Sequence, residues 1–252
     1  MKNDGSSDRM DRRRFIALGV TAGAGLIGTA EPERAEAAMP ARGIPPLPTL
    51  ELPEKLFNTA GYGISRKTHE EHYAIYERYV ATANALRGRL GAVANPAAAD
   101  PLYSEVRDLK IGYANAVNAV RSHELFFNTL GGKQTDVEGN VEEALKEGFG
   151  SFANWQTDMR ATALSARAWA WLAIDHIDGL MQNYLGDDEH SYPIWQATPI
   201  LAIDMTEHAY YLDFAHDRAK YLDAIFDVID WPAVASRLKA AKSVATAARD
   251  AR

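Results

Sequence analysis

A carboxylate and an imidazole stand four residues apart late in the chain, at Asp204 and His208. Side chains of these two types together are the usual ligands of a borderline transition metal. The apolar run 198–203, which has the pattern of a short buried strand, leads directly into the pair. On an ordinary surface helix the same spacing would give only an i,i+4 contact, so the pair alone is a weak indication. A metal centre would need further ligands from other elements of the chain.

A longer pattern surrounds the pair, Asp-Met-Thr-Glu-His-Ala-Tyr-Tyr at 204–211. This string resembles the signature of the iron/manganese superoxide dismutases at every position but one, because Thr206 stands where that family has a tryptophan. The resemblance continues through 212–231 and reaches back toward Leu47. It implies an oxidoreductase that converts superoxide into oxygen and hydrogen peroxide, with one iron or manganese ion per subunit as cofactor. Asp204 and His208 would be two of the metal ligands.

A third ligand is implied by the Ser-His-Glu-Leu-Phe-Phe sequence at 122–127. It looks like the family's Asn-His-x-x-Phe-Trp, which places His123 at the ligand position. Ser122 and Phe127 depart from the family pattern. The alternative is that His123 has no metal and only caps the apolar face of a helix.

The fourth ligand, from the first helix, can be counted in two ways. The family has an Ile-Ser pair, then six residues, then the ligand histidine; in this chain the pair at 64–65 and the six residues 66–71 lead to His72. Counting back from a downstream pattern that resembles the family's Tyr-Val-Asn-Asn-x-Asn reaches Glu71 instead. His69, one helical turn earlier, is a further candidate.

Helix geometry favours His72. At about 100° per residue, Tyr76 lies about 40° and Tyr79 about 20° around the helix from His72, so the three share one face. We therefore predict His72 as the ligand and Tyr79 as the phenol that relays protons. Tyr76 stands where the family usually has another histidine. Trp169 and Trp171 look like the family's aromatic lining.

The family also places an amide against the solvent molecule on the metal. Some family members supply this amide from the second helix. At that position this chain has Ala119, whose side chain cannot supply a hydrogen bond. His190 is spaced from Asp204 within a residue of family members that carry histidine there. We predict that His190 takes the role, and that with Asp204 it tunes the solvent and the metal potential. We assign His176 and His216 to the solvated surface.

Two long helical patterns must position the first two histidines, at 65–90 and 102–129. A glycine pair at 131–132 stops the second one. A short connection between two helices predicts an antiparallel hairpin. The proline-rich segment 38–58 is predicted to be extended and incompatible with helix.

The C-terminal part mixes helices with three adjacent strands, which is an α+β arrangement. The predicted strands and helices are 137–147 (helix), 149–165 (helix), 168–174 (strand), 180–185 (strand), 198–203 (strand), 218–228 (helix) and 231–245 (helix). In the family, an N-terminal antiparallel helical hairpin packs on a C-terminal α/β domain with a three-stranded antiparallel sheet, and the metal lies between them. We therefore expect a hairpin domain at 38–133 and a metal-binding domain at 134–252.

The first 37 residues have the pattern of a removable twin-arginine signal. Arg12 and Arg13 precede an apolar, small-residue run at 16–30, and Ala-Glu-Ala at 35–37 offers a cleavage site. The run is too short and too rich in glycine and alanine to span a bilayer. The sequence thus predicts an exported protein, periplasmic or extracellular, without stable membrane association.

Composition narrows the class of protein. The 252 residues are 47% hydrophobic and 24% charged, as in a globular protein with a sizeable core. The net charge of −7 argues against nucleic acid as a partner. There is no cysteine, which excludes disulfides, thiolate metal sites and cysteine nucleophiles.

The resemblance also implies a homodimer. Glu207 matches a family glutamate that reaches across a two-fold interface to the ligand histidine of the other subunit, here His208; otherwise it is a surface carboxylate. An alternative function is a metal-binding or structural relative with little dismutase activity. Where the family often has an arginine pair near the substrate funnel, this chain has Asp217 and Arg218. This departure, with those at Tyr76, Thr206 and Phe127, favours that alternative, whereas the four retained ligands argue against it. Iron and manganese both accept this ligand set.

Overall fold

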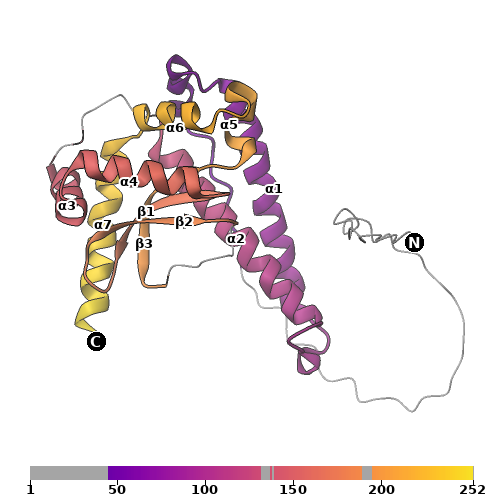
Figure 1. The fold of residues 1–252 in the computed structure, drawn as a ribbon. Helices are drawn as coiled ribbons and strands as arrows, with labels where there is room; N and C mark the ends of the chain where they lie inside the picture. Colours follow the sequence, from indigo (N-terminus) through magenta and orange to yellow (C-terminus); the bar gives the residue numbers. More distant parts are fainter. Residues whose placement is uncertain (1–44, 132–136, 138, 189–194, 252) are drawn as a thin grey trace, which may run out of the picture. The chain divides into compact units, whose positions relative to one another are not determined.

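The computed structural model describes residues 45–131, 137, 139–188 and 195–251 (Figure 1). The predicted signal at 1–37 and His190 lie outside the described residues. The predicted boundary between 133 and 134 also falls in a part that is not described, so the two domain ranges stay a prediction. None of the described helices is long and apolar enough to cross a membrane.

Two long helices, α1 (Arg66–Gly91) and α2 (Glu105–Thr129), lie side by side as the predicted hairpin (Figure 1). Each begins at a serine whose hydroxyl accepts a hydrogen bond from a backbone N–H of the first turn, Ser65 for α1 and Ser104 for α2. Such caps satisfy N–H groups that have no partner within the helix. A short 3₁₀ turn, η2 (Pro96–Ala98), lies in the connection.

The proline-rich segment before α1 leads into a helical segment that the sequence prediction excluded. The 3₁₀ helix η1 (Glu54–Tyr62) begins directly after Pro53 and ends at Gly63, which has φ of 89°. The prediction of extended chain over 38–58 is therefore wrong from Glu54 onward. Pro53 precedes the helix, where a missing N–H costs nothing, and no proline lies within it.

Side chains of α1 hold the extended part of this proline-rich segment, before η1, along the helix. Asn84 both accepts a hydrogen bond from the backbone N–H of Leu47 at 2.7 Å and donates one to its carbonyl at 3.1 Å. The Tyr76 hydroxyl accepts from the N–H of Leu50 at 2.7 Å, and the Tyr73 hydroxyl donates to its carbonyl at 2.8 Å. Polar side chains of α1 thus satisfy backbone groups of a segment that lies outside the three-stranded sheet.

The sheet has three antiparallel strands in the order β2-β1-β3. They are β1 (Trp169–Asp175), β2 (Met181–Gly186) and β3 (Ala197–Asp204). The central strand β1 and the last five residues of β3 are almost entirely buried. These are the runs that the sequence shows as apolar.

Helices cover the sheet and continue to the end of the chain. They are α3 (Gly139–Phe149), α4 (Phe152–Ser165), α5 (Glu207–Phe214), α6 (Arg218–Asp227) and α7 (Trp231–Asp250). Helices α2 and α7 pack on β3, whereas α3 and α4 pack on β2 (Figure 1). The predicted α+β class, with a helical hairpin followed by a three-stranded antiparallel sheet, is confirmed.

Candidate metal centre

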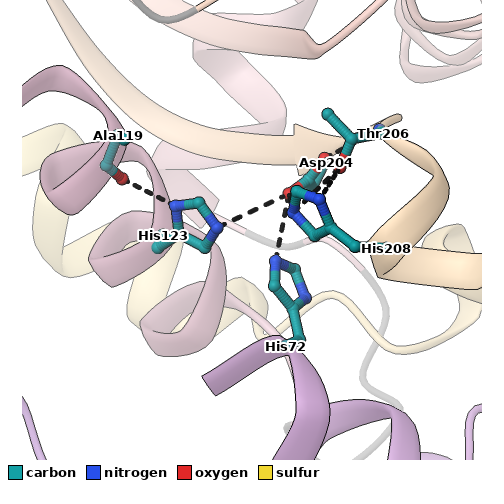
Figure 2. Close-up of polar contacts among 6 residues, drawn as sticks. All are labelled: His72, Ala119, His123, Asp204, Thr206 and His208. Atoms are coloured by element: carbon teal, nitrogen blue, oxygen red, sulfur yellow. Dashed lines mark hydrogen bonds and ion pairs between the residues drawn. The ribbon is translucent and has the colours of Figure 1, made fainter. Parts of the chain in front are cut away.

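Four side chains from four elements meet where the helical hairpin contacts the end of β3 (Figure 2). They are His72 of α1, His123 of α2, Asp204 at the end of β3 and His208 of α5. One nitrogen or oxygen of each lies within 4.8 Å of those of all the others. Three of the side chains are at most 1% exposed, and His208 is 25% exposed. The four residues predicted as ligands are therefore brought together.

The backbone of the 204–211 motif explains how Asp204 and His208 reach the site. Asp204 is the last residue of β3 and pairs with Trp169 of β1, so its place is fixed by the sheet. The chain then turns, with the Thr206 N–H donating to Asp204 Oδ1 at 2.8 Å, as aspartate often does at turns. Helix α5 begins at Glu207, so His208 lies in its first turn.

One oxygen of Asp204 is the geometric focus of the cluster. Its Oδ2 lies 3.0 Å from Nε2 of His72, 3.2 Å from Nε2 of His208 and 3.9 Å from Nε2 of His123. Its Oδ1 accepts hydrogen bonds from the backbone N–H and the hydroxyl of Thr206. The carboxylate thus presents a single oxygen to the three nitrogens.

The hydrogen bonding of His123 leaves one ring nitrogen available to a cation. Its Nδ1–H donates to the carbonyl oxygen of Ala119, one turn earlier in α2, at 2.7 Å. Its Nε2 is buried and has no hydrogen-bond partner among the residues that the structure describes. Leaving a buried polar atom unpaired costs about 1–3 kcal/mol, and a cation at the centre of the cluster would satisfy it. The residues present therefore fit a metal ion.

The protonation states of the cluster also suit a cation. Burial lowers the pKa of His123 to about 3, with His72 acting in the same direction. Burial likewise lowers the pKa of His72, although Asp204 opposes the effect. Burial alone would raise the pKa of Asp204, but hydrogen bonds from His208 and His72 outweigh it and hold that pKa well below its usual value. Neutral imidazoles and an ionised carboxylate are the forms that bind metal.

The competing first-helix candidates lie elsewhere. His69 is buried, but its Nε2 is 2.7 Å from the hydroxyl of Thr59 in η1. Glu71 is exposed. The structure places His72 beside Asp204, and neither alternative belongs to the cluster.

The two tyrosines of the same helix face take different places. The Tyr79 ring lies 5.5 Å from that of His123, at the margin of the cluster. Tyr76 is fully buried and donates its hydroxyl hydrogen to Oε1 of Glu124 at 3.0 Å. The structure thus brings Tyr79 near the centre, and its proton-relay role stays a prediction.

Aromatic rings enclose the imidazoles. The Trp169 ring stands edge-on to that of His123, with the centroids 5.1 Å apart, and Trp171 stacks on Trp169 at 6.2 Å. Phe126 and Phe127 lie 5.1 and 5.2 Å from the ring of His72. A hydrophobic shell of this kind limits solvent access and so affects a metal's potential.

The assignment of His176 to the solvated surface is wrong. The residue is only 9% exposed, its ring Nε2 lies 2.8 Å from the Thr198 hydroxyl, and its backbone N–H donates to the carbonyl oxygen of Gln196. The start of β3 returns to cover it, which a local pattern does not show. His216 is exposed, as expected.

One residue at the site was noticed in the sequence only as a departure. The Thr206 hydroxyl donates to Asp204 Oδ1 at 2.6 Å and lies within 3.0 Å of the His208 ring nitrogens (Figure 2). An Asp-x-Thr sequence after a buried strand is a turn pattern in which such contacts occur. That pattern could have indicated the interaction.

Comparisons with known proteins agree with this geometry. Residues 137–237 match the family model of the C-terminal domain of iron/manganese superoxide dismutases. The chain is 34% identical over 194 residues to the iron superoxide dismutase of Aquifex aeolicus, an alignment that covers 75% of this chain and 90% of the relative. An iron superoxide dismutase of Cupriavidus metallidurans is 31% identical over 183 residues, covering 71% and 90%. Manganese superoxide dismutase 1 of Halobacterium salinarum is 34% identical over 122 residues, covering 47% and 60%. The chain belongs to the iron/manganese superoxide dismutase family.

Proposed function

We propose that this protein is a superoxide dismutase in which His72, His123, Asp204 and His208 hold one iron or manganese ion per subunit. The observation that carries the proposal is the convergence of three imidazole nitrogens on one oxygen of a buried carboxylate. Membership of the family supports it, since relatives named as iron and as manganese enzymes both match the chain.

The residues present define what the protein contributes to the reaction. When bound, iron or manganese alternates between its trivalent and divalent states, so that one superoxide is oxidised to oxygen and a second, with two protons, is reduced to hydrogen peroxide. The four side chains supply only one formal negative charge, from Asp204. A bound cation therefore keeps net positive charge, which attracts an anionic substrate into a protein whose net charge is −7.

Proton supply and solvent tuning involve residues at the margin of the site. We assign proton relay to Tyr79, whose ring contacts that of His123. We assign hydrogen bonding to solvent in the site to His190, because Ala119 offers no polar side chain toward it. Both assignments support the uptake of protons that the reduction of superoxide requires.

The proposed assembly is an exported homodimer. Glu207 is exposed and neighbours His208, the most exposed of the four ligand candidates. On the same helix, Tyr211 and Leu212 are 57% and 55% exposed, so α5 offers an apolar contact next to the site. Export rests on the twin-arginine pattern at Arg12 and Arg13.

The function is tested with purified chain loaded with iron or manganese. We expect rapid superoxide decay that neither the metal-free chain nor the same concentration of free metal produces. A His123→Ala variant should lose the decay, whereas a His216→Ala variant, changed at an exposed histidine, should keep it. Decay no faster than with free metal would favour the alternative of a metal-binding relative without turnover.

A further inference from the structure

The Thr206 side chain contacts two of the proposed ligands (Figure 2). Its Oγ1 lies 2.6 Å from Oδ1 of Asp204 and 3.0 Å from Nδ1 of His208. Its backbone N–H donates to the same Oδ1 at 2.8 Å. Asp204 Oδ1 therefore has two donors from one residue, and Oδ2 is left to face the imidazoles.

The proton of the hydroxyl can be assigned by its partners. An ionised carboxylate only accepts hydrogen bonds, so the hydroxyl hydrogen of Thr206 goes to Asp204. A threonine hydroxyl has one hydrogen, so Oγ1 can act toward His208 only as an acceptor.

The contact between Thr206 and His208 is not such a hydrogen bond. Oγ1 lies 3.0 Å from Nδ1 and 2.9 Å from Nε2 of His208, so it is almost equally far from both ring nitrogens. An imidazole N–H points outward in the plane of its ring, so neither nitrogen can direct a hydrogen at an oxygen in that position. The hydroxyl therefore packs against the His208 ring, whose Nε2 lies 3.2 Å from Asp204 Oδ2.

We propose that Thr206 is a positioning residue that fixes the orientation of Asp204 through two hydrogen bonds to Oδ1, and so strengthens metal binding. The proposal rests on the proposed function, because it takes Asp204 as a ligand. The motif that this chain resembles has tryptophan at this place, which has no hydroxyl. The hydroxyl bond from Thr206 to Asp204 is thus a property of this chain.

The contact also affects the metal's reduction potential in a defined direction. A hydrogen bond donated to Asp204 withdraws charge from the carboxylate and favours the divalent over the trivalent ion. Removal of the hydroxyl should therefore lower the potential.

The test compares three variants of the whole chain. Thr206→Val removes the hydroxyl, and Thr206→Ser keeps it. Thr198→Val is the matched control, because Thr198 is also half-buried, lies on β3 and contacts an imidazole, that of His176, which is not a proposed ligand. Affinity for manganese(II) is measured by chelator competition, and the midpoint potential by redox titration of the manganese-loaded chain.

We expect Thr206→Val to bind manganese(II) about 10- to 100-fold more weakly and to have a lower potential. Thr206→Ser and Thr198→Val should retain the wild-type values. If Thr206→Val does not fold, as judged by near-ultraviolet circular dichroism of the metal-free chain, Thr206→Ala carries the same expectation.

Two results would overturn the inference, and they are distinguishable. Equal affinity and potential in wild type and Thr206→Val overturn the role of Thr206 alone. A wild-type chain that binds neither manganese(II) nor iron(II) overturns the proposed function, and the role of Thr206 with it.

Discussion

Nε2 of His72 lies 3.0 Å from Oδ2 of Asp204, although 132 positions separate the two residues in the chain. One comes from the first helix of the hairpin and the other from the end of the third strand. Neither group is more than 1% exposed. A buried carboxylate is costly unless it is paired, so the contact joins the packing of the hairpin on the sheet to the chemistry of the site.

Changing Asp204 to asparagine should remove metal binding while the chain still folds. Asparagine keeps the shape and the oxygen that accepts from Thr206, but the only formal negative charge of the ligand set is lost. We expect metal content, measured by elemental analysis after loading and desalting, to fall at least about tenfold. Asp223→Asn, changed at an exposed carboxylate of α6, should bind as the wild type does. Full metal content in Asp204→Asn would contradict the ligand assignment.

His69 should make the metal-free chain sensitive to acid. Burial lowers its pKa to about 4, with a further lowering by His72, whereas Asp213 opposes the shift. In the unfolded chain His69 titrates near 6.5, so between pH 6.5 and 4 the unfolded state binds more protons. Stability from this residue is therefore present above pH 6.5 and lost as the pH falls toward 4, by up to roughly 3 kcal/mol.

The measurement is denaturant unfolding of the metal-free chain across this pH range. In His69→Gln the fall in the free energy of unfolding between pH 6.5 and 4 should be smaller than in the wild type. His216→Gln, changed at an exposed histidine, serves as the control. An identical pH dependence in His69→Gln and wild type would show that His69 is not the source.

The hairpin, the sheet and the end of β3 could be predicted because their apolar periodicity is local. The choice of His72 also came from local geometry: α1 runs unbroken from Arg66 to Gly91, so helical rotation decides which side chains share a face. Residue counting alone did not exclude Glu71. Counting forward from the Ile-Ser pair reaches His72, whereas counting back from the downstream pattern reaches Glu71, as if one residue were deleted between them.

The three features that were not predicted from the sequence have a different physical origin. The burial of His176 depends on the hydroxyl of Thr198, 22 positions away, which a local window cannot include. The helical segment η1 was missed because Pro53 was taken to rule out helix, although it stands before the first turn. Thr206 was recognised only as a departure from a tryptophan, because a substitution in a motif does not say which new hydrogen bonds it makes.

Glu207 should be needed for the homodimer that we propose. If its carboxylate accepts a hydrogen bond from His208 of a second copy, its loss weakens both halves of a symmetric contact. We expect Glu207→Ala to shift sedimentation toward monomer at micromolar concentration and to lower metal content. Glu71→Ala, changed at another exposed helical carboxylate, should leave both unchanged. A dimer with full metal content in Glu207→Ala would count against the interface.

Export should depend on Arg12 and Arg13. Twin-arginine signals carry folded cargo, so on this proposal the protein would acquire its metal before export. Changing both arginines to lysine should leave the precursor in the cytoplasm, as seen by fractionation and immunoblotting. Changing Lys2 to arginine leaves the pair intact and should permit export. Mature protein outside the cell after the double change would refute the route.

His190 should tune the reaction without holding the metal. An imidazole differs from the amide that the family uses because it titrates near pH 6.5, and a nearby cation should lower that value. Superoxide turnover by the metal-loaded chain should then be flat at neutral pH and change on acidification as the imidazole protonates. His190→Gln should retain metal and abolish this acid limb, because an amide does not titrate. His190→Ala should retain metal but lose most turnover, since nothing replaces the hydrogen bond to solvent. Unchanged turnover and potential in His190→Ala would move the role to another residue, first to Tyr79, whose ring lies 5.5 Å from that of His123.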